Sequence, residues 1–133
     1  MKNIFLAIAA FLFIFSCRSA EEEMLDNANY VGTWNWMATT GGVANVNETP
    51  ASTGKTRSIT LTADYKYTIK ENDAVVNEGT YSLSMFVSNT DHLQRVYIDF
   101  SNYPDKLVRT VTSTELFLYD DTPDGFDYHY TKN

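Results

Sequence analysis

The chain has 133 residues, of which 44% are hydrophobic and 14% aromatic, and a formal net charge of −7. This acidic balance argues against a nucleic-acid partner, because binding to phosphates requires a basic surface. The single cysteine excludes an intramolecular disulfide and a metal site built on several thiolates, and the length allows one hydrophobic core rather than two.

The first predicted element is a short apolar segment at the N-terminus. Lys2 precedes an uncharged run over residues 4–15, which is followed by Ser16 and Cys17. One positive charge, an apolar run of this length and a small residue after it are typical of a secretory signal. The run is shorter than the roughly 20 residues that a membrane-spanning helix needs. We therefore predict a signal helix over residues 1–16.

The residues around the cysteine, Ile14-Phe15-Ser16-Cys17, resemble the lipobox of bacterial lipoproteins. The resemblance implies that the Cys17 thiol receives a diacylglycerol, that the signal is cleaved before this residue, and that the new amine is acylated. Lipidation also explains a lone thiol in an exported protein. The alternative interpretation is an ordinary secretory signal followed by an incidental cysteine.

Residues 17–29 are polar and acidic, and we predict that they form a tether between the lipid and a folded domain. The run Glu21–Glu23 resembles the signal that carries Bacteroidetes lipoproteins to the outer leaflet of the outer membrane. That resemblance implies a membrane partner through the N-terminal lipid and a location at the outer membrane, and it leaves open which leaflet carries the domain. The alternative is an ordinary solvated linker.

From residue 30 onward, apolar residues alternate with polar ones, which is the pattern of half-buried strands. The predicted strands cover residues 30–39, 57–62, 65–70, 75–83, 95–100, 106–112, 115–119 and 126–131. Most of them are joined by hairpin-length links, except for a long polar loop over residues 40–55. The pattern predicts one all-β domain over residues 30–133, namely an eight-stranded antiparallel up-and-down barrel. A sandwich of the same strands is the alternative.

The first predicted strand matches, at Gly32 and Trp34, the Gly-x-Trp signature of lipocalins. Residues 28–132 look like the small lipocalin-like lipoproteins of Bacteroidetes, and the segments that carry this resemblance are Val31–Trp36, Thr49–Gly54, Gly79–Tyr81 and Asp124–Phe126. The resemblance implies a barrel that Trp34 closes at one end, with Gly32 allowing the strand to bend. In lipocalins a cation from a late strand covers this tryptophan, and Arg109 or Lys132 can do so here. The domain is shorter than typical lipocalins, and their second signature, Thr-Asp-Tyr in a late loop, is absent.

Motifs for catalysis and metal binding are weak in this chain. Residues 54–56 read Gly-Lys-Thr but lack the earlier glycine and the strand–helix context of a phosphate-binding loop. Residues 120–125 match half of a calcium loop, but its twelfth position is Thr131 rather than glutamate. The two histidines, His92 and His129, do not form a pair at zinc-ligand spacing. We predict no enzymatic activity, no metal and no cofactor.

Five aromatic residues share the predicted inward faces: Trp36, Tyr67, Tyr81, Phe100 and Tyr128. They either fill the barrel or line a pocket, because eight strands leave room for side chains or for one small ligand. The preferred function is a monomeric, lipid-anchored binding module for a small apolar or amphipathic molecule. The alternative is a structural or interaction lipoprotein with a filled barrel that engages another envelope protein.

Overall fold

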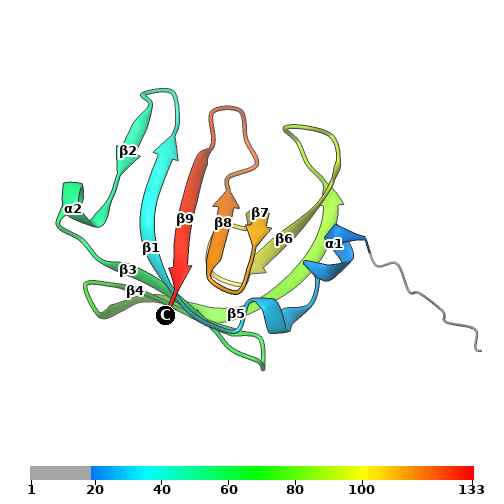
Figure 1. Cartoon of the computed structure of the whole chain (residues 1–133), viewed down its shortest axis with the longest axis horizontal. Coiled ribbons are helices and arrows are strands. Elements are labelled where there is room, and N and C mark those ends of the chain that lie inside the picture. The colour runs from blue at the N-terminus through cyan, green and yellow to red at the C-terminus, as the bar shows by residue number, and fades with distance from the viewer. Residues whose placement is uncertain (1–18) are drawn as a thin grey trace, which may run out of the picture.

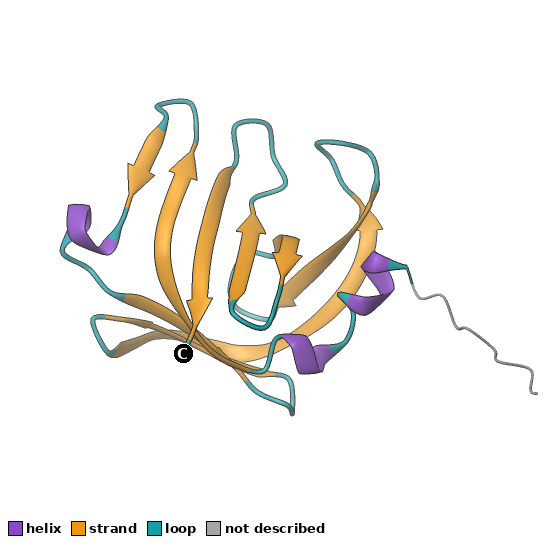
Figure 2. Cartoon of the chain, in the orientation of Figure 1, coloured by secondary structure: helices purple, strands orange, loops and turns teal. Residues whose placement is uncertain are grey.

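The computed structural model describes residues 19–133, in which nine strands form one antiparallel sheet (Figure 1, Figure 2). The strands are β1 (Gly32–Gly41), β2 (Val46–Glu48), β3 (Arg57–Leu61), β4 (Lys66–Glu71), β5 (Ala74–Val87), β6 (Gln94–Phe100), β7 (Lys106–Val111), β8 (Glu115–Tyr119) and β9 (Phe126–Lys132). The short helical segments are α1 (Ala20–Glu23), a 3-10 turn (Asn27–Asn29) and α2 (Pro50–Thr53). The predicted signal helix over residues 1–16 and the predicted lipid attachment at Cys17 lie outside the described residues.

The sheet closes on itself because β9 pairs with both β8 and β1. From β3 to β9 each strand pairs with the next along the chain, and β3 also pairs with the first half of β1. The short β2 pairs with the last residues of β1, beyond the part that pairs with β3. Eight strands therefore make a closed antiparallel up-and-down barrel, and this prediction is confirmed. The alternative of a two-sheet sandwich is wrong, because one continuous ladder runs round the molecule.

The alternation of apolar and polar residues decides which face of each strand is buried. In β8, Leu116 and Leu118 are buried whereas Glu115 is exposed, and in β6 Val96 and Ile98 are buried. These side chains share one hydrophobic core inside the barrel. Burying an aliphatic side chain of this size contributes about 1.5–3 kcal/mol relative to leaving it in water. A shift of a strand by one residue would turn all of its apolar side chains to solvent, so burial fixes the register of each strand.

The polar segment 40–55, predicted as one long loop, contains structure of its own. β1 continues to Gly41, β2 pairs back on it, and α2 follows. Reciprocal hydrogen bonds between Thr49 and Ser52 cap the start of α2, and Gly54 ends it in the left-handed conformation with φ of 68°. Such caps satisfy backbone groups that a four-residue helix cannot pair internally. The segment is therefore an ordered edge of the barrel.

The described part of the segment predicted as an acidic tether, residues 19–29, folds against the barrel. Met24 and Leu25 pack on the hydrophobic core. The Tyr30 hydroxyl donates to the Met24 carbonyl at 2.6 Å, and the Asn29 side-chain amide donates to the Glu23 carbonyl at 2.8 Å. Two apolar residues in an otherwise charged stretch are enough to dock it, because they bury surface that water would otherwise contact.

Candidate functional site

The indole of Trp34 is fully buried in the hydrophobic core of the barrel. Its Nε1 donates to the Tyr30 carbonyl at 2.8 Å, and the Lys132 ammonium lies 4.9 Å from the ring centroid. Gly32 has φ of 138°, and a Cβ at this position would collide with the Lys132 side chain. The glycine therefore leaves room for the lysine to cover the tryptophan, which is a favourable cation–π contact.

Arg109, the other cation that the sequence offered for this place, lies elsewhere. Its guanidinium is 4.1 Å from the Tyr119 ring centroid, and its Nε is 2.7 Å from Asp127 Oδ1. The structure thus places Lys132 over Trp34 and Arg109 on the outer wall, which corrects the sequence-based assignment of Arg109 to barrel closure. A bulge in the β7–β8 ladder between Val108 and Thr110 changes the register at Arg109, and the alternation pattern could not show this.

Three of the five predicted ligand-binding aromatics belong to the packed part of the core. The Tyr67 hydroxyl donates to Asn77 Oδ1 at 2.6 Å, and the Tyr81 hydroxyl donates to the Thr62 carbonyl at 3.0 Å. Phe100 packs edge-on against Tyr67 with ring centroids 4.8 Å apart. Both tyrosine hydroxyls are thus hydrogen-bonded within the protein, and none of the three residues lines the cavity described next.

The other two predicted residues, Trp36 and Tyr128, line a cavity of about 350 Å³ inside the barrel. The remaining wall includes Ile59, Ile69, Tyr103 and Tyr130. Exposed side chains of β4 and β5, Lys70 and Val76, form its edge, so the cavity opens to solvent there. Apolar walls with a few polar groups are typical of small-molecule sites.

An ion-pair network stands at the wall formed by Trp36. The Arg57 guanidinium lies 4.6 Å from the Trp36 ring centroid, and its Nε donates to Glu71 Oε2 at 3.1 Å. The other Glu71 oxygen is 3.2 Å from the Lys55 ammonium. The hydrogen bond from Lys55, followed by that from Arg57, holds the pKa of Glu71 below its usual value. This corner of the cavity therefore carries two cations around one carboxylate.

A second charged group, Lys106, points into the barrel and was missed by the sequence analysis. Lys106 is 5% exposed, pairs with Asp120 Oδ1, and lies 4.5 Å from the Tyr128 ring centroid and 5.4 Å from that of Tyr103. The Tyr128 hydroxyl donates to Asp120 Oδ2 at 2.8 Å. Burial first, and then this carboxylate, raise the pKa of Tyr128. The sequence did contain a signal for this: in a strand, alternate residues share a face, so Lys106 lies on the same inward face as Val108.

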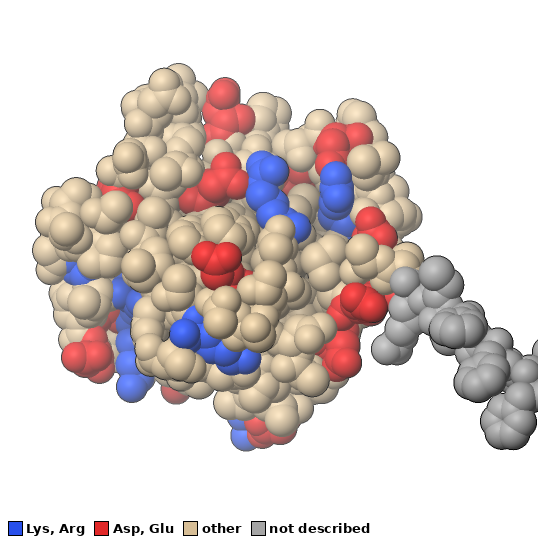
Figure 3. Space-filling model, viewed as in Figure 1, with Lys and Arg blue, Asp and Glu red and all other residues tan. Residues whose placement is uncertain are grey.

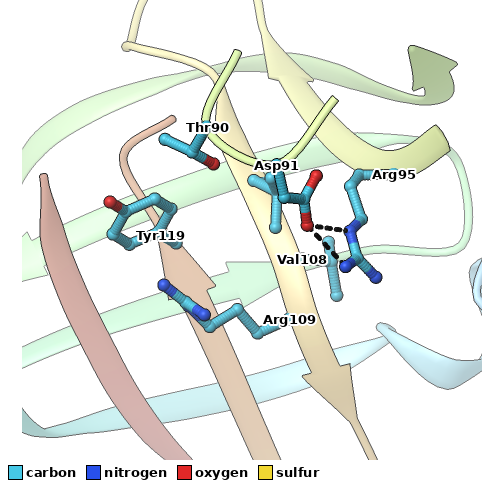
Figure 4. Close-up of a pocket in the computed structure, with 7 residues that line it drawn as sticks. Thr90, Asp91, Arg95, Val108, Arg109 and Tyr119 are labelled. Atoms are coloured by element: carbon cyan, nitrogen blue, oxygen red, sulfur yellow. Dashed lines mark hydrogen bonds and ion pairs between the residues drawn. The ribbon is translucent and has the colours of Figure 1, made fainter. Parts of the chain in front are cut away.

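A smaller depression of about 130 Å³ lies on the outer wall and is drawn in Figure 4. Arg95 and Arg109 flank it, and both are paired: Arg95 Nε donates to Asp91 at 2.9 Å, and Arg109 contacts Asp127. With its cations already neutralised and its volume about that of a few water molecules, this depression is a weaker candidate than the internal cavity.

Histidine and acidic side chains are the possible metal ligands in the part of the chain that the structure describes. Within residues 19–133, no group of three or more His, Cys, Asp or Glu side chains is placed to hold an ion. His129 instead stacks on Phe117 with ring centroids 4.3 Å apart. On the face shown in Figure 3, acidic and basic side chains are interspersed.

Fold and cavity together define a small closed β-barrel with an aromatic-lined internal cavity. No helix in the described part of the chain is long and apolar enough to cross a membrane. Comparison of the chain with protein-family models, with curated proteins and with solved structures finds no significant match.

Proposed function

We propose that this chain is a lipid-anchored lipoprotein of the bacterial outer membrane whose barrel binds one small apolar or amphipathic molecule as a non-catalytic monomer. The observation that carries the binding function is the cavity of about 350 Å³ bounded by Trp36, Tyr103, Tyr128 and Tyr130. Ligand sites commonly have volumes of about 300–1,000 Å³. The cavity is therefore sufficient for one compact molecule.

The cavity favours binding over the alternative of a filled, purely structural barrel. Protein interiors are close-packed, whereas the side chains around this solvent-open cavity leave a space of about 350 Å³. In a barrel that served only as a solid support, larger side chains at Ile59 or Ile69, both of which line this space, would fill it.

The lipid anchor is proposed from the lipobox-like sequence that ends at Cys17, and the docked N-terminal segment adds to it. Cys17 precedes Ser19, the first described residue, by two positions, a reach of at most about 7 Å of extended chain. Because residues 19–29 pack on the barrel, a lipid at Cys17 would hold the domain directly at the bilayer surface. In Figure 1, α1 and α2 lie on opposite sides of the barrel, so α2 would be distant from a lipid attached just before α1.

Native mass spectrometry of the protein purified gently from its host tests the binding function. We expect the mass of the acylated chain plus that of one small molecule. Ile59→Trp, which places an indole in the cavity, should abolish the additional mass. Val43→Trp is the matched control, because Val43 is 87% exposed in the turn after β1. Loss of the small molecule in both variants, or its absence from the wild-type protein, would contradict the proposal.

A further inference from the structure

We propose that the ligand is an organic anion, and that its carboxylate or similar oxyanion accepts hydrogen bonds from Tyr103, Tyr130 and Arg57 inside the barrel. This inference rests on the proposed binding function and adds the chemical class of the ligand. It follows from three observations: two phenol hydroxyls that make no hydrogen bond to residues 19–133, an adjacent guanidinium whose terminal nitrogens make none to these residues either, and the balance of charge around the cavity.

The hydroxyl groups of Tyr103 and Tyr130 have no hydrogen-bond partner among residues 19–133, although both side chains line the cavity. Tyr130 is only 7% exposed. Tyr128 shows the usual behaviour of a tyrosine in this barrel, because its hydroxyl donates to Asp120. The only buried side-chain polar atom without a partner in residues 19–133 is Nε2 of His129, so both phenol oxygens keep access to solvent. Their hydroxyl groups can therefore donate to a molecule in the cavity without breaking a hydrogen bond within the protein.

Arg57 lies within electrostatic reach of both phenols. Burial raises the pKa of Tyr130, the neighbouring Tyr103 raises it further, and Arg57 lowers it. The pKa of Tyr103 is likewise raised by burial and by Asp120 and lowered by Arg57. Only the Nε of Arg57 is used in its bond to Glu71, so the terminal nitrogens keep their donors within the described residues. Neutral phenols and a guanidinium are all donors toward an oxyanion.

The charges around the cavity favour an anion, although the whole chain carries −7. Four cations stand on its walls, at its rim or against its tyrosine rings: Lys55, Arg57, Lys70 and Lys106. Two carboxylates, Glu71 and Asp120, oppose them. The local excess of positive charge attracts an anion into a cleft with low-dielectric walls, where the interaction is stronger than in water.

A cationic ligand is disfavoured even though aromatic rings surround the cavity. Three of the four aromatic rings that line the cavity already carry an internal cation, with Arg57 over Trp36 and Lys106 over Tyr128 and Tyr103. A ligand cation would have to displace these groups or lie beside like charges, and both are unfavourable. The same rings still provide apolar contact for the body of an anionic molecule.

Three naphthalene probes that differ mainly in charge test this inference: 1-naphthoate, 1-naphthamide and 1-naphthylmethylammonium. The protein is used as its host processes it, held in nanodiscs, and each probe is titrated calorimetrically against loaded and empty nanodiscs. We expect naphthoate to bind about tenfold more tightly than naphthamide, as one charge-assisted hydrogen bond would give. The ammonium probe should bind most weakly.

Tyr130→Phe removes one hydroxyl and leaves the ring in place. We expect it to weaken naphthoate binding about three- to tenfold and naphthamide binding by a smaller factor, because a hydrogen bond to a charged acceptor is stronger than one to an amide oxygen. The matched control is Tyr119→Phe on the outer wall, where the hydroxyl donates to the Thr122 carbonyl at 3.0 Å, and it should change neither affinity. Circular dichroism confirms that each variant is folded, and Tyr103→Phe replaces any variant that is not.

The outcomes separate this inference from the binding function on which it rests. If naphthamide or the ammonium probe binds as tightly as naphthoate, or if Tyr130→Phe affects naphthoate and naphthamide equally, the anionic ligand class is wrong and the binding function stands. If none of the three probes binds above the level of empty nanodiscs, the binding function itself is overturned.

Discussion

The Lys132 ammonium lies 4.9 Å from the ring centroid of Trp34 and so joins the last strand of the barrel to the first. In the β1–β9 ladder these two residues are direct partners. The contact therefore lies where the sheet closes, between the strands β1 and β9.

A double-mutant cycle between Lys132→Met and Trp34→Phe should give a coupling free energy of about 0.5–1.5 kcal/mol, the range for a cation–π contact that is partly shielded from water. Unfolding in urea supplies the four free energies. The corresponding cycle with Arg109→Met is the control and should give no coupling, because Arg109 lies over Tyr119. A coupling free energy with Arg109 but not with Lys132 would mean that Arg109, and not Lys132, covers Trp34.

Replacing Lys106 with methionine should lower the free energy of unfolding by about 2–3 kcal/mol. The substitution leaves the Asp120 carboxylate without its cation, and such losses reach about 3–5 kcal/mol for fully buried pairs. The Asp120 side chain is 25% exposed, so water compensates for part of the loss. Lys66→Met is the control, since Lys66 pairs with Asp64 at the surface with both side chains more than 60% exposed. Equal effects of the two substitutions would show that Lys106 is not buried.

The architecture was predictable because period-two alternation is local and is enforced by burial. The predicted strand over residues 115–119 coincides with β8, and the strands around Ile59 and Ile98 differ from the prediction by one residue at most. The short β2 and α2 were missed, because three or four residues are too few to show a period. The docking of Met24 was also missed, since two apolar residues in a charged stretch look like a linker.

For the candidate site, the sequence predicted which side chains point into the barrel, but not how far along the barrel axis each of them lies. Alternation assigned Trp36 and Tyr67 to the inside of the barrel, but only Trp36 reaches the cavity. Depth along the axis depends on strand stagger, which arises from closure of the whole sheet. Tyr103 lies between the predicted strands 95–100 and 106–112 and was therefore not assigned to a face, and its ring packs edge-on to Phe100 with centroids 5.7 Å apart. Lys106 was overlooked because a charged residue at a strand end is usually exposed.

Leu25→Ala should cost about 1–2 kcal/mol of unfolding free energy, less than a fully buried leucine because Leu25 is only partly covered. The residue packs on the core from the segment that precedes β1. Glu22→Ala in the exposed part of α1 serves as the control and should lie within about 0.5 kcal/mol of the wild type. A neutral Leu25→Ala would indicate that residues 19–29 are a free tether after all.

Cys17→Ser should release the protein from membranes or leave an unprocessed precursor, because serine provides no thiol for the diacylglycerol. Fractionation of host cells and intact mass spectrometry measure both effects. Ser16→Ala, which keeps a small residue before the cleavage position, is the control and should remain membrane-bound. A Cys17→Ser protein that is correctly cleaved and still membrane-bound would rule out lipid anchorage at this residue.

The Asp121 carboxylate should make the barrel sensitive to acid. Burial raises its pKa, but hydrogen bonds from the Asn89 amide and the hydroxyls of Tyr97, Thr90 and Ser88 outweigh burial and lower it to about 2. An aspartate in an unfolded chain titrates near about 3.9, so its stabilisation is complete above about pH 4 and is lost as the pH falls toward 2. Asp121→Asn should reduce stability at pH 6 and flatten the decline of the melting temperature between pH 5 and 2. Asp124→Asn, an exposed change in the same loop, is the control and should keep the wild-type dependence of the melting temperature on pH. If Asp121→Asn also keeps that dependence, the Asp121 carboxylate does not hold the loop over residues 88–91.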